Sequence, residues 1–425
     1  MKAVRRLRLA RRRSTGAFLP DAAGPVPRDR LPGVADPSRP YDVVLFGATG
    51  FTGGLTAEYL ARSAPPECRW AVAGRNQGKL EGLRSRLAAI EPECADLPLL
   101  RCDVEQPDTV REVAESTRVV ITTVGPYINY GEPLVAACAQ AGTDYTDLTG
   151  EPEFVDLMYV RHHARAVETG ARLVHACGFD SIPHDLGALF TVEQLPSDVP
   201  IDLKGFVTAG GKPSAGTFHS AITGFSRVRG MNKVAAERKR MEPRPTDRKV
   251  RGHKSKPYRD PDVRAWALPM PTIDPQVILR SARALERYGP DFTYGHFAAV
   301  KRLPIAVAGV AGVASLFTLA QIPPARDFLL GRMESGDGPS PSEREKGWFK
   351  VTFVGNGGGQ KVMTEVSGGD PGYGETSKML AEAALCLAHD DLPETAGQVT
   401  TAVAMGRPLI DRLEGRGIAF RTLES

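Results

Sequence analysis

The chain has 425 residues, of which 42% are hydrophobic and 24% are charged. This length suits two or three domains of roughly 100–200 residues each, and the composition excludes a wholly disordered protein. The net charge of +4 is too small to indicate a nucleic-acid partner. The six cysteines include no CxxC pair, which excludes a zinc ribbon and a small disulfide-linked scaffold and indicates a reducing cytoplasm.

The N-terminal segment is basic and then rich in proline. Residues 1–13 carry arginine and lysine but no acid, and six prolines follow between residues 20 and 40. There is no apolar stretch of the kind found in secretory signals, and the prolines would break the amphipathic helix of a transit peptide. We therefore expect residues 1–40 to form a disordered tail.

The segment from Tyr41 predicts a buried strand, a glycine turn and a helix, in the order YDVVLFGATGFTGGLTAEYLAR. A strand that leads through G-x-x-G-x-x-G into a helix is typical of dinucleotide-binding sites. The first glycine allows the tight turn, the second lets the backbone approach a pyrophosphate, and the third lets the helix pack on the strand. The N–H groups at the start of the helix favour phosphate. The predicted cofactor contacts in this turn are Gly47, Thr49, Gly50, Phe51, Thr52 and Gly53.

The second predicted strand, residues 70–76, ends in Gly74-Arg75. Sites that prefer NAD usually place an Asp or Glu here to bond the ribose 2′-hydroxyl. A guanidinium can instead pair with a 2′-phosphate and stack on adenine, so Arg75 favours NADP over NAD. The alternative is an ordinary solvated arginine at the end of a strand.

Further strands predicted at residues 97–104, 118–127 and 143–151, and from Ala171 onward, complete a doubly wound parallel sheet. Residues at the ends of the third and fourth strands would lie along the adenine, the ribose and the nicotinamide. These additional predicted contacts are Asp103, Val124, Gly125 and Pro126. We predict that residues 41–190 form an NADP-binding Rossmann domain.

The second half predicts a mixed α/β (α+β) domain for substrate binding or association over residues 191–370. It contains a β-hairpin over residues 346–369, with a glycine-rich turn. Residues 371–425 predict a helical segment that packs back on the Rossmann domain, through an apolar face that includes Met379, Leu380 and Leu387.

Two segments of this second half are unusual in composition. Residues 227–259 are strongly basic, which indicates either a solvated loop or a surface for an acidic partner or anionic membrane. Residues 303–325 carry no charge, but alanine, glycine and three prolines weaken the case for a membrane-spanning helix. A buried or interfacial helix is the better prediction.

The chain resembles the saccharopine dehydrogenase-like oxidoreductases, in particular the bacterial trans-acting enoyl reductases. The resemblance covers nearly everything after Pro40, and its motifs are VVLFGATGFTG, AGRN, TTVGPYINYGEPLVAACAQAGTDYTDLTGE, HACGFDSIPHDLG and GGDPGYGETSKMLAEAALCLA. It implies an NADP-binding Rossmann domain, an inserted α/β domain and a C-terminal helix that returns to the first domain. It also implies reduction of an acyl double bond on a lipid or polyketide-type precursor, in lipid or glycolipid biosynthesis.

Enoyl reduction needs a hydride from the cofactor, a donor that stabilises the enolate, and a proton for the α-carbon. Tyr127, Asp180 and His184 are the predicted catalytic residues, because they follow predicted strands at the cofactor edge. Alternatives stay open, since Asp180-Ser181 also fits a helix N-cap and His184 an ordinary histidine. Cys177, at the end of a predicted strand near the cleft, fits a buried small apolar residue better than a nucleophile.

No metal site is expected, because no His/Cys set has ligand spacing. Two other functions remain open, a non-catalytic NADP-binding regulator or scaffold and a saccharopine-type imine-reducing dehydrogenase. The expected partners are an acyl or lipid-like substrate, free or bound to a carrier, and an anionic membrane surface. A homo-oligomer stays open, and no nucleic acid is expected. These partners would place the protein in the cytoplasm or at the inner face of the plasma membrane.

Overall fold

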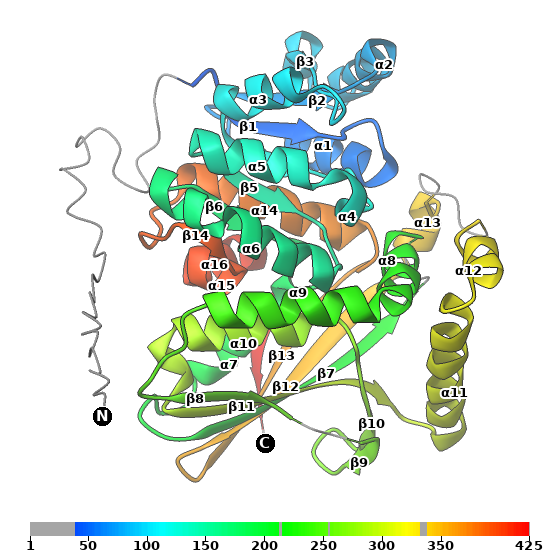
Figure 1. Cartoon of the computed structure of the whole chain (residues 1–425), viewed down its shortest axis with the longest axis vertical. Coiled ribbons are helices and arrows are strands. Elements are labelled where there is room, and N and C mark those ends of the chain that lie inside the picture. The colour runs from blue at the N-terminus through cyan, green and yellow to red at the C-terminus, as the bar shows by residue number, and fades with distance from the viewer. Residues whose placement is uncertain (1–38, 212–214, 254–255, 332–337, 425) are drawn as a thin grey trace, which may run out of the picture.

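The computed structural model describes residues 39–211, 215–253, 256–331 and 338–424, which form two β-sheets with helices around and between them (Figure 1). Most of the predicted N-terminal tail lies outside these described residues. Arg39 was predicted to belong to that tail, but its guanidinium donates hydrogen bonds to the carbonyl of Ala141 (2.5 Å) and the carbonyl of Thr117. The ordered body therefore begins before residue 40.

The first sheet has seven parallel strands in the order β14-β6-β5-β4-β1-β2-β3. The order reverses direction between β1 and β4, which is the switch point of a doubly wound Rossmann sheet. The predicted fold class is confirmed. The strands are β1 (Tyr41–Phe46), β2 (Trp70–Gly74), β3 (Leu99–Arg101), β4 (Thr117–Thr122), β5 (Asp144–Asp147), β6 (Arg172–Val174) and β14 (Gly397–Val399).

Helices cover both faces of this sheet, which explains why its central strands are apolar throughout. One face packs on α1 (Phe51–Ser63) and α14 (Gly374–His389), and the other on α3 (Pro107–Ser116), α5 (Glu132–Ala141) and α6 (Pro152–Thr169). The remaining short elements of this half are α2 (Gln77–Ala88), η2 (Pro92–Asp96) and α4 (Tyr127–Tyr130).

The second sheet has eight strands, in the order β15-β13-β12-β7-β11-β10-β9 with β8 beside β11. The predicted hairpin is present as β12 and β13, and its two turn residues, Gly358 and Gly359, have φ of +60° and +75°. Such a turn favours glycine at both positions. The strands are β7 (Ile201–Gly210), β8 (Lys249–Gly252), β9 (Tyr258–Asp260), β10 (Ala265–Pro269), β11 (Asp291–Val300), β12 (Trp348–Gly357), β13 (Gln360–Gly368) and β15 (Ala419–Leu423).

Helix α7 (Ile182–Val192) is buried along its whole length, and contacts both β12 and β13 of the second sheet and α10 (Asp274–Ala284). It therefore forms much of the core that joins the two halves. The other helices of this half are α8 (Ala215–Ser226), α9 (Val228–Met241), η3 (Glu286–Tyr288), α11 (Leu303–Ala320), α12 (Pro323–Leu330), α13 (Pro341–Arg344), α15 (Thr401–Ala404) and α16 (Gly406–Gly415).

The C-terminal segment contributes strands to both sheets, so the prediction that residues 371–425 are simply helical is incomplete. Strand β14 extends the Rossmann sheet beside β6, and β15 extends the second sheet beside β13. Helix α14 is buried on all sides, and its Glu382 carboxylate accepts hydrogen bonds from Tyr59 (2.6 Å), Arg412 (3.1 Å) and Arg416 (3.1 Å). These bonds satisfy a charge that would otherwise be costly to bury.

The basic segment 227–259 is not a loop, which corrects the prediction. It forms α9, β8 and β9. Several of its arginines pair with acids from other elements: Arg227 with Glu153 (2.6 Å), Arg238 with Asp156 (2.5 Å) and Arg251 with Asp291 (2.7 Å). Part of this positive charge is therefore paired with acids within the fold.

Helix α11 corresponds to the uncharged segment 303–325. Only Ala306 and Ala320 of its 18 residues are buried, so burial within the protein is excluded for most of the helix. By length and composition α11 is the one helix in the described part of the chain that could cross a membrane, which by itself is weak evidence that it does.

Candidate active site

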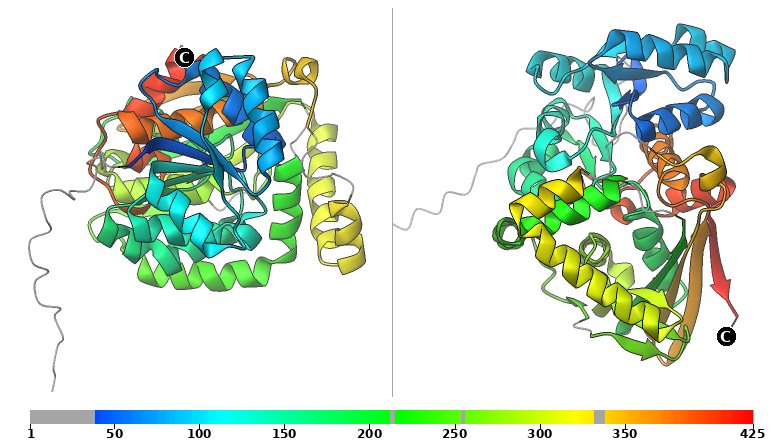
Figure 2. Two further views of the ribbon diagram at one scale, coloured as in Figure 1. Left: turned by 90° about the horizontal axis from the view of Figure 1, so that it is seen from above. Right: turned by 90° about the vertical axis from the view of Figure 1, so that its right-hand side faces the viewer.

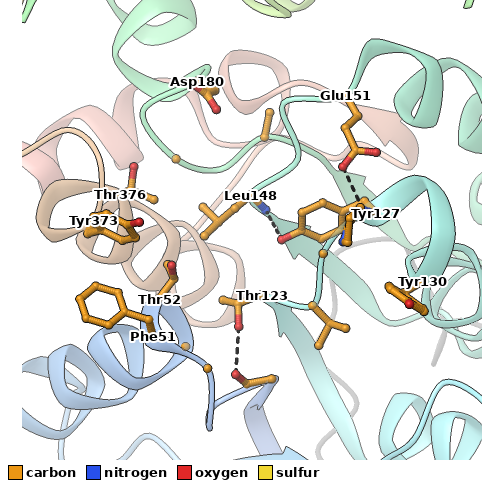
Figure 3. A pocket seen from close by; sticks show the side chains of 18 of the residues that line it. Phe51, Thr52, Thr123, Tyr127, Tyr130, Leu148, Glu151, Asp180, Tyr373 and Thr376 are labelled. Carbon is orange, nitrogen blue, oxygen red and sulfur yellow. Dashed lines mark hydrogen bonds between the residues drawn. The ribbon is translucent and has the colours of Figure 1, made fainter. Parts of the chain in front are cut away.

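A cleft of about 810 Å³ lies between the two halves, at the carboxyl ends of β1, β4, β5 and β6. Ligands of doubly wound sheets bind at this edge, beside the switch point. The opposite wall comes from the end of β7, from Thr223 on α8, from Met270 and Thr272 after β10, and from Tyr373 at the start of α14. Figure 3 shows part of this lining at close range.

The glycine turn lets β1, the start of α1 and the end of β4 pack closely against one another. Gly47 has a φ of +88°, and a Cβ atom there would lie 2.7 Å from a Val124 methyl group. A Cβ on Gly53 would lie 2.2 Å from the carbonyl oxygen of Gly47. The Thr123 hydroxyl donates a hydrogen bond to the same oxygen (3.2 Å), as drawn in Figure 3. Gly47 and Gly53 are therefore required by the packing of β1, α1 and β4.

Gly50 differs from these two glycines, because the protein itself leaves room for a side chain there. The one contact of a Cβ on Gly50 would be the Gly47 carbonyl oxygen at 3.4 Å. Gly50 is the N-cap of α1, is exposed and lines the cleft with Thr49, Phe51 and Thr52. A close approach by a ligand to the N-terminus of α1 explains this glycine, and a pyrophosphate suits that position.

The adenosine end of the cleft lies at β2 and β3. Arg75 directly follows β2, is exposed and lines the cleft, as does Asp103 after β3. Next to Arg75, the Asn76 side chain accepts a hydrogen bond from the N–H of Lys79 (2.9 Å) and caps α2. Arg75 is the one lysine, arginine or histidine among the described residues that line the cleft. Its role as the partner of a 2′-phosphate stays a prediction.

Val124, Gly125 and Pro126 line the cleft after β4, as predicted, but the next residue does not behave as expected. The Tyr127 hydroxyl donates to the Thr122 carbonyl (3.1 Å) and accepts from the N–H of Leu148 (3.1 Å), both within the protein (Figure 3). Burial raises the pKa of Tyr127 well above its ordinary value. The prediction that this hydroxyl points freely into the cleft is wrong, because its one proton is donated to the Thr122 carbonyl and it also accepts from the N–H of Leu148.

Glu151 is a residue of the cleft that the sequence analysis missed. Its carboxylate accepts hydrogen bonds from the N–H of Tyr127 (3.0 Å), as Figure 3 shows, and from the N–H of Ile128 (2.9 Å), at the start of α4. Burial raises the pKa of Glu151. The carboxylate fixes the turn that carries Gly125 and Pro126 past the cofactor position. The one signal in the sequence that could have indicated Glu151 is its position directly after the TDLTG segment.

Asp180 lies in the turn between β6 and α7 and lines the cleft, where it is partly exposed. Burial, and to a smaller degree the charge of Asp274, raises the pKa of Asp180 to about 7. The helix begins at Ile182, so Asp180 and His184 are not on one helix face. Ser181 holds the N-cap position but makes no capping bond with its side chain. Asp180 is therefore an acid that can hold a proton near neutral pH.

His184 does not line the cleft, which corrects its predicted catalytic placement. It is buried, with its Nε2 3.5 Å from one carboxylate oxygen of Asp274, while Nε2 of His296 lies 3.4 Å from the other. Burial lowers the pKa of His184 to about 4. Burial alone would raise the pKa of Asp274, but the two histidines outweigh it and the pKa is lowered. Asp274 therefore stays ionised at neutral pH, and its negative charge is the one that acts on Asp180.

The donor atoms of His184, Asp274 and His296 all lie within 4.8 Å of one another, close enough for one metal ion. These residues come from α7, α10 and β11, so the spacing along the sequence could not reveal the cluster. The absence of a metal stays a prediction.

A second buried network supports the floor of the cleft. The fully buried Asp147, at the end of β5, accepts hydrogen bonds from the Tyr145 hydroxyl (3.0 Å), His175 (2.7 Å) and the N–H of Ala176 (2.8 Å). Ala176 lines the cleft and has a φ of +60°, which is unusual for a residue other than glycine. Neighbouring Cys177 is fully buried and burial raises the pKa of its thiol, so it is no nucleophile.

A doubly wound sheet, a glycine turn that opens the N-terminus of a helix and an arginine after the second strand define an NADP-binding oxidoreductase of the Rossmann class. Comparison with known proteins agrees, since residues 43–174 match the saccharopine dehydrogenase NADP binding domain. The trans-acting enoyl reductase of Mycobacterium bovis (strain BCG) is 34% identical over 420 residues, which cover 90% of this chain and 98% of that protein.

The saccharopine dehydrogenase-like oxidoreductase of Bos taurus is 31% identical over 445 residues, which cover 92% of this chain and 99% of that protein. The chain belongs to the saccharopine dehydrogenase-like oxidoreductase family, and its cofactor is NADP. Among solved structures, apo saccharopine dehydrogenase (L-Glu forming) from Saccharomyces cerevisiae covers 90% of this chain with a TM-score of 0.53. That chain is covered completely but is only 12% identical, so the likeness shows the fold alone.

Proposed function

We propose that the protein is an NADPH-dependent enoyl reductase that acts on a lipid or polyketide-type acyl substrate. The observation that carries this proposal is the charge of the cleft. Beyond Arg75, at the adenosine end, no described residue that lines the cleft is a cation, whereas Glu151 and Asp180 are acids. An acyl thioester needs no cation for recognition, so this lining suits it.

The same observation argues against a saccharopine-type imine-reducing dehydrogenase. Saccharopine carries several carboxylates, and proteins usually bind carboxylates with arginine or lysine in a bidentate or ion-paired arrangement. The wall opposite the cofactor edge instead offers Ala209, Met270 and Tyr373, with Leu148 and Phe179 beside them. An apolar acyl group fits this lining better than an amino acid does.

The residues at the cofactor edge fit a bound NADPH. The N-terminus of α1 would hold the pyrophosphate, Arg75 the 2′-phosphate, and the segment Val124–Pro126 would lie against the ribose and nicotinamide. The rings of Phe51 and Tyr373, 4.9 Å apart, join α1 to α14 and help to close the cleft on that side. When bound, the reduced cofactor supplies the hydride.

Asp180 is the residue best placed to supply the proton. Reduction of a carbon–carbon double bond adds a hydride to the β-carbon and a proton to the α-carbon, and the cofactor leaves oxidised. With its pKa near 7, Asp180 is about half protonated at neutral pH and mostly protonated below it, and solvent can restore the proton after each turnover. A general acid works best when its pKa lies near the working pH.

The names of the relatives support the same reaction, because a trans-acting enoyl reductase is 34% identical over 90% of this chain. By analogy, the substrate would be presented on a carrier by a synthase in the cytoplasm. The competing function, a regulator that binds NADP without catalysis, has no feature of the cleft in its favour.

Substrate-dependent oxidation of NADPH, followed by its absorbance, tests the proposal. Enoyl thioesters of short and long chains, an aldehyde with an amino acid (which together form an imine), α-keto acids with ammonia and simple ketones are supplied in parallel. We expect turnover only with the enoyl thioesters, and faster turnover with longer chains. Turnover with an imine alone would refute the proposal, and turnover with none of the substrates, by protein that binds NADPH, would favour the regulator.

A further inference from the structure

Helix α11 presents an apolar surface that the rest of the protein does not cover. It has 18 uncharged residues with a mean hydropathy of 2.0, and 11% of it is buried. Of the 13 exposed large hydrophobic side chains in the described part of the chain, nine lie in α11, in α12 or between them. This concentration distinguishes the segment from the scattered apolar residues of an ordinary surface. Both views in Figure 2 place these yellow helices on the outside of the molecule.

The exposure extends around most of the helix. Ile305, Val307 and Val313 are 55%, 60% and 46% exposed, and at 100° per residue they point in widely different directions. The buried residues Ala306 and Ala320 lie within about 40° of each other, so α11 touches the body along one narrow stripe. A helix that is apolar all round belongs inside a protein core or inside a membrane. Because α11 is not in the core, a bilayer is the environment that suits it.

A flat protein surface, including that of a second copy, would cover only one side of such a helix. Hydrocarbon can surround an inserted helix on every side that the body of the protein leaves exposed. An interfacial amphipathic helix also fails as a description, since α11 has no polar face to keep in water.

Positive charge stands at the N-terminal end of the apolar segment. Lys301 and Arg302 are exposed directly before α11, whereas Arg326 in α12 is paired with the exposed Asp327 (3.3 Å). Basic residues at the ends of an apolar helix lie at the level of the headgroups, where anionic lipids attract them. The charges therefore favour an anionic bilayer over a neutral one.

Both ends of α11 are fixed to the same body of the protein. The helix begins directly after β11, and beyond its end the Gln321 side chain donates to the Phe225 carbonyl on α8 (2.5 Å). The Phe317 ring also contacts the Phe225 ring, with centroids 5.6 Å apart. A helix of about 27 Å held in this way can enter one leaflet but cannot cross to the other side.

We propose that α11 inserts into one leaflet of an anionic lipid bilayer and docks the protein there as a monotopic membrane protein. Helix α8 connects this surface to the cleft, because Phe225 contacts α11 while Thr223 lines the cleft. If the reductase function proposed above holds, a long acyl chain reaches the cleft from the bilayer along α8. The docking itself does not depend on that function.

Flotation of the full chain with vesicles tests the insertion without substrate or cofactor. Vesicles of phosphatidylcholine, with and without 30% phosphatidylglycerol, are mixed with the protein at low salt and then brought to about 1 M salt, where the screening length is about 3 Å. We expect the protein to float with anionic vesicles and to remain bound at high salt. Absence of flotation at low salt, or release at high salt, would overturn the insertion.

The variant Val307→Asp/Val310→Asp places two charges on the exposed apolar surface, at positions that are 60% and 46% exposed. We expect at least a tenfold loss of vesicle binding, with unchanged thermal unfolding and NADPH binding. The matched control is Val167→Asp on α6, which is 47% exposed and should bind vesicles like the parent chain. Equal vesicle binding by the parent and the double variant would overturn the proposal. A parent chain that dimerises and ignores vesicles would show that a second copy covers the helix instead.

A fluorescent probe on the helix reports its surroundings directly. All six cysteines are buried, so Ser315→Cys, in the exposed part of α11, supplies a selectively reactive thiol. We expect the emission of a polarity-sensitive label at position 315 to shift to the blue on vesicles. The same label at Glu168→Cys, an exposed position of α6, should show no shift. A label at position 315 that stays in a water-like environment on bound vesicles would contradict insertion.

Discussion

A Cβ atom on Gly53 would lie 2.2 Å from the carbonyl oxygen of Gly47, so these two residues pack without room for even a methyl group. We expect Gly53→Ala to destabilise the fold by about 1–3 kcal/mol, as overpacking of a core does. Urea unfolding measures the loss. Gly82→Ala in exposed α2, where an added Cβ meets nothing within 4 Å, is the control and should be neutral or stabilising. Equal stability of both variants would contradict the observed packing.

Gly50→Val separates binding from folding at the same turn. The backbone of Gly50, with φ −77° and ψ 169°, suits a β-branched residue, and the nearest protein atom to its Cβ is 3.4 Å away. The variant should therefore fold normally but lose binding of NADPH and NADH, because its side chain occupies the space for the pyrophosphate. Calorimetric titration beside urea unfolding gives both quantities, and retained binding in the folded variant would remove Gly50 from the site.

Arg75→Glu should weaken NADPH binding at least tenfold, which corresponds to about 1.4 kcal/mol, while NADH binding changes little. The reason is that a like charge replaces the partner of the 2′-phosphate. Arg111→Glu makes the same change of charge on α3, outside the cleft, and serves as the control. If both cofactors weaken equally, Arg75 contributes general attraction and does not select the phosphate.

Asp180 as the proton donor predicts a particular pH dependence. The pKa of Asp180 is raised to about 7, and the protonated form is the active one, so kcat for an enoyl thioester should fall as the pH rises through about 7. Asp180→Asn should lower kcat by 10²–10⁴-fold, roughly the contribution of a general acid, and leave NADPH affinity within about twofold. A variant that keeps the parent's rate and pH profile would exclude Asp180 as the acid.

The same carboxyl group should make the protein less stable at high pH. Its pKa is about 7 when folded and near 3.8 in the unfolded chain, so the folded state holds the proton more tightly. The stability that this proton provides is complete below about pH 4 and is lost as the pH rises through about 7. Asp180→Asn has no such loss, so its melting temperature should exceed the parent's by more at pH 8 than at pH 4. A constant difference across this range would contradict the raised pKa.

The sequence predicts the cofactor half well because its determinants are local. The strand, the glycine turn and the helix of residues 41–63 are adjacent along the chain, so the G-x-x-G-x-x-G motif is enough to predict the backbone of the pyrophosphate turn. Arg75 likewise follows its strand directly. In each case a short segment fixes both the backbone and the chemistry of the contact.

The substrate half is less predictable, because its geometry depends on contacts between distant residues. Tyr127 follows a motif that reaches the cleft, but only the fold shows that the carbonyl of Thr122 and the N–H of Leu148 occupy its hydroxyl. The pairing of His184 with Asp274 and His296 joins α7, α10 and β11, far apart in the chain. The three-residue strand β14 is too short to give a recognisable period, so its place in the first sheet could not be predicted.

The position of β14 has a consequence for how the chain folds during synthesis. The Rossmann sheet begins with β1 near residue 41 but gains its edge strand from residues 397–399, and α14, which packs on β4 and β5, begins at residue 374. N-terminal domains commonly fold first as they leave the ribosome. Here the nucleotide-binding half must wait for almost the whole polypeptide. Until then the outer edge of β6 and the apolar surface under α14 stay uncovered. We therefore expect chaperones to bind the nascent chain, because they bind exposed apolar surface and unpaired strand edges.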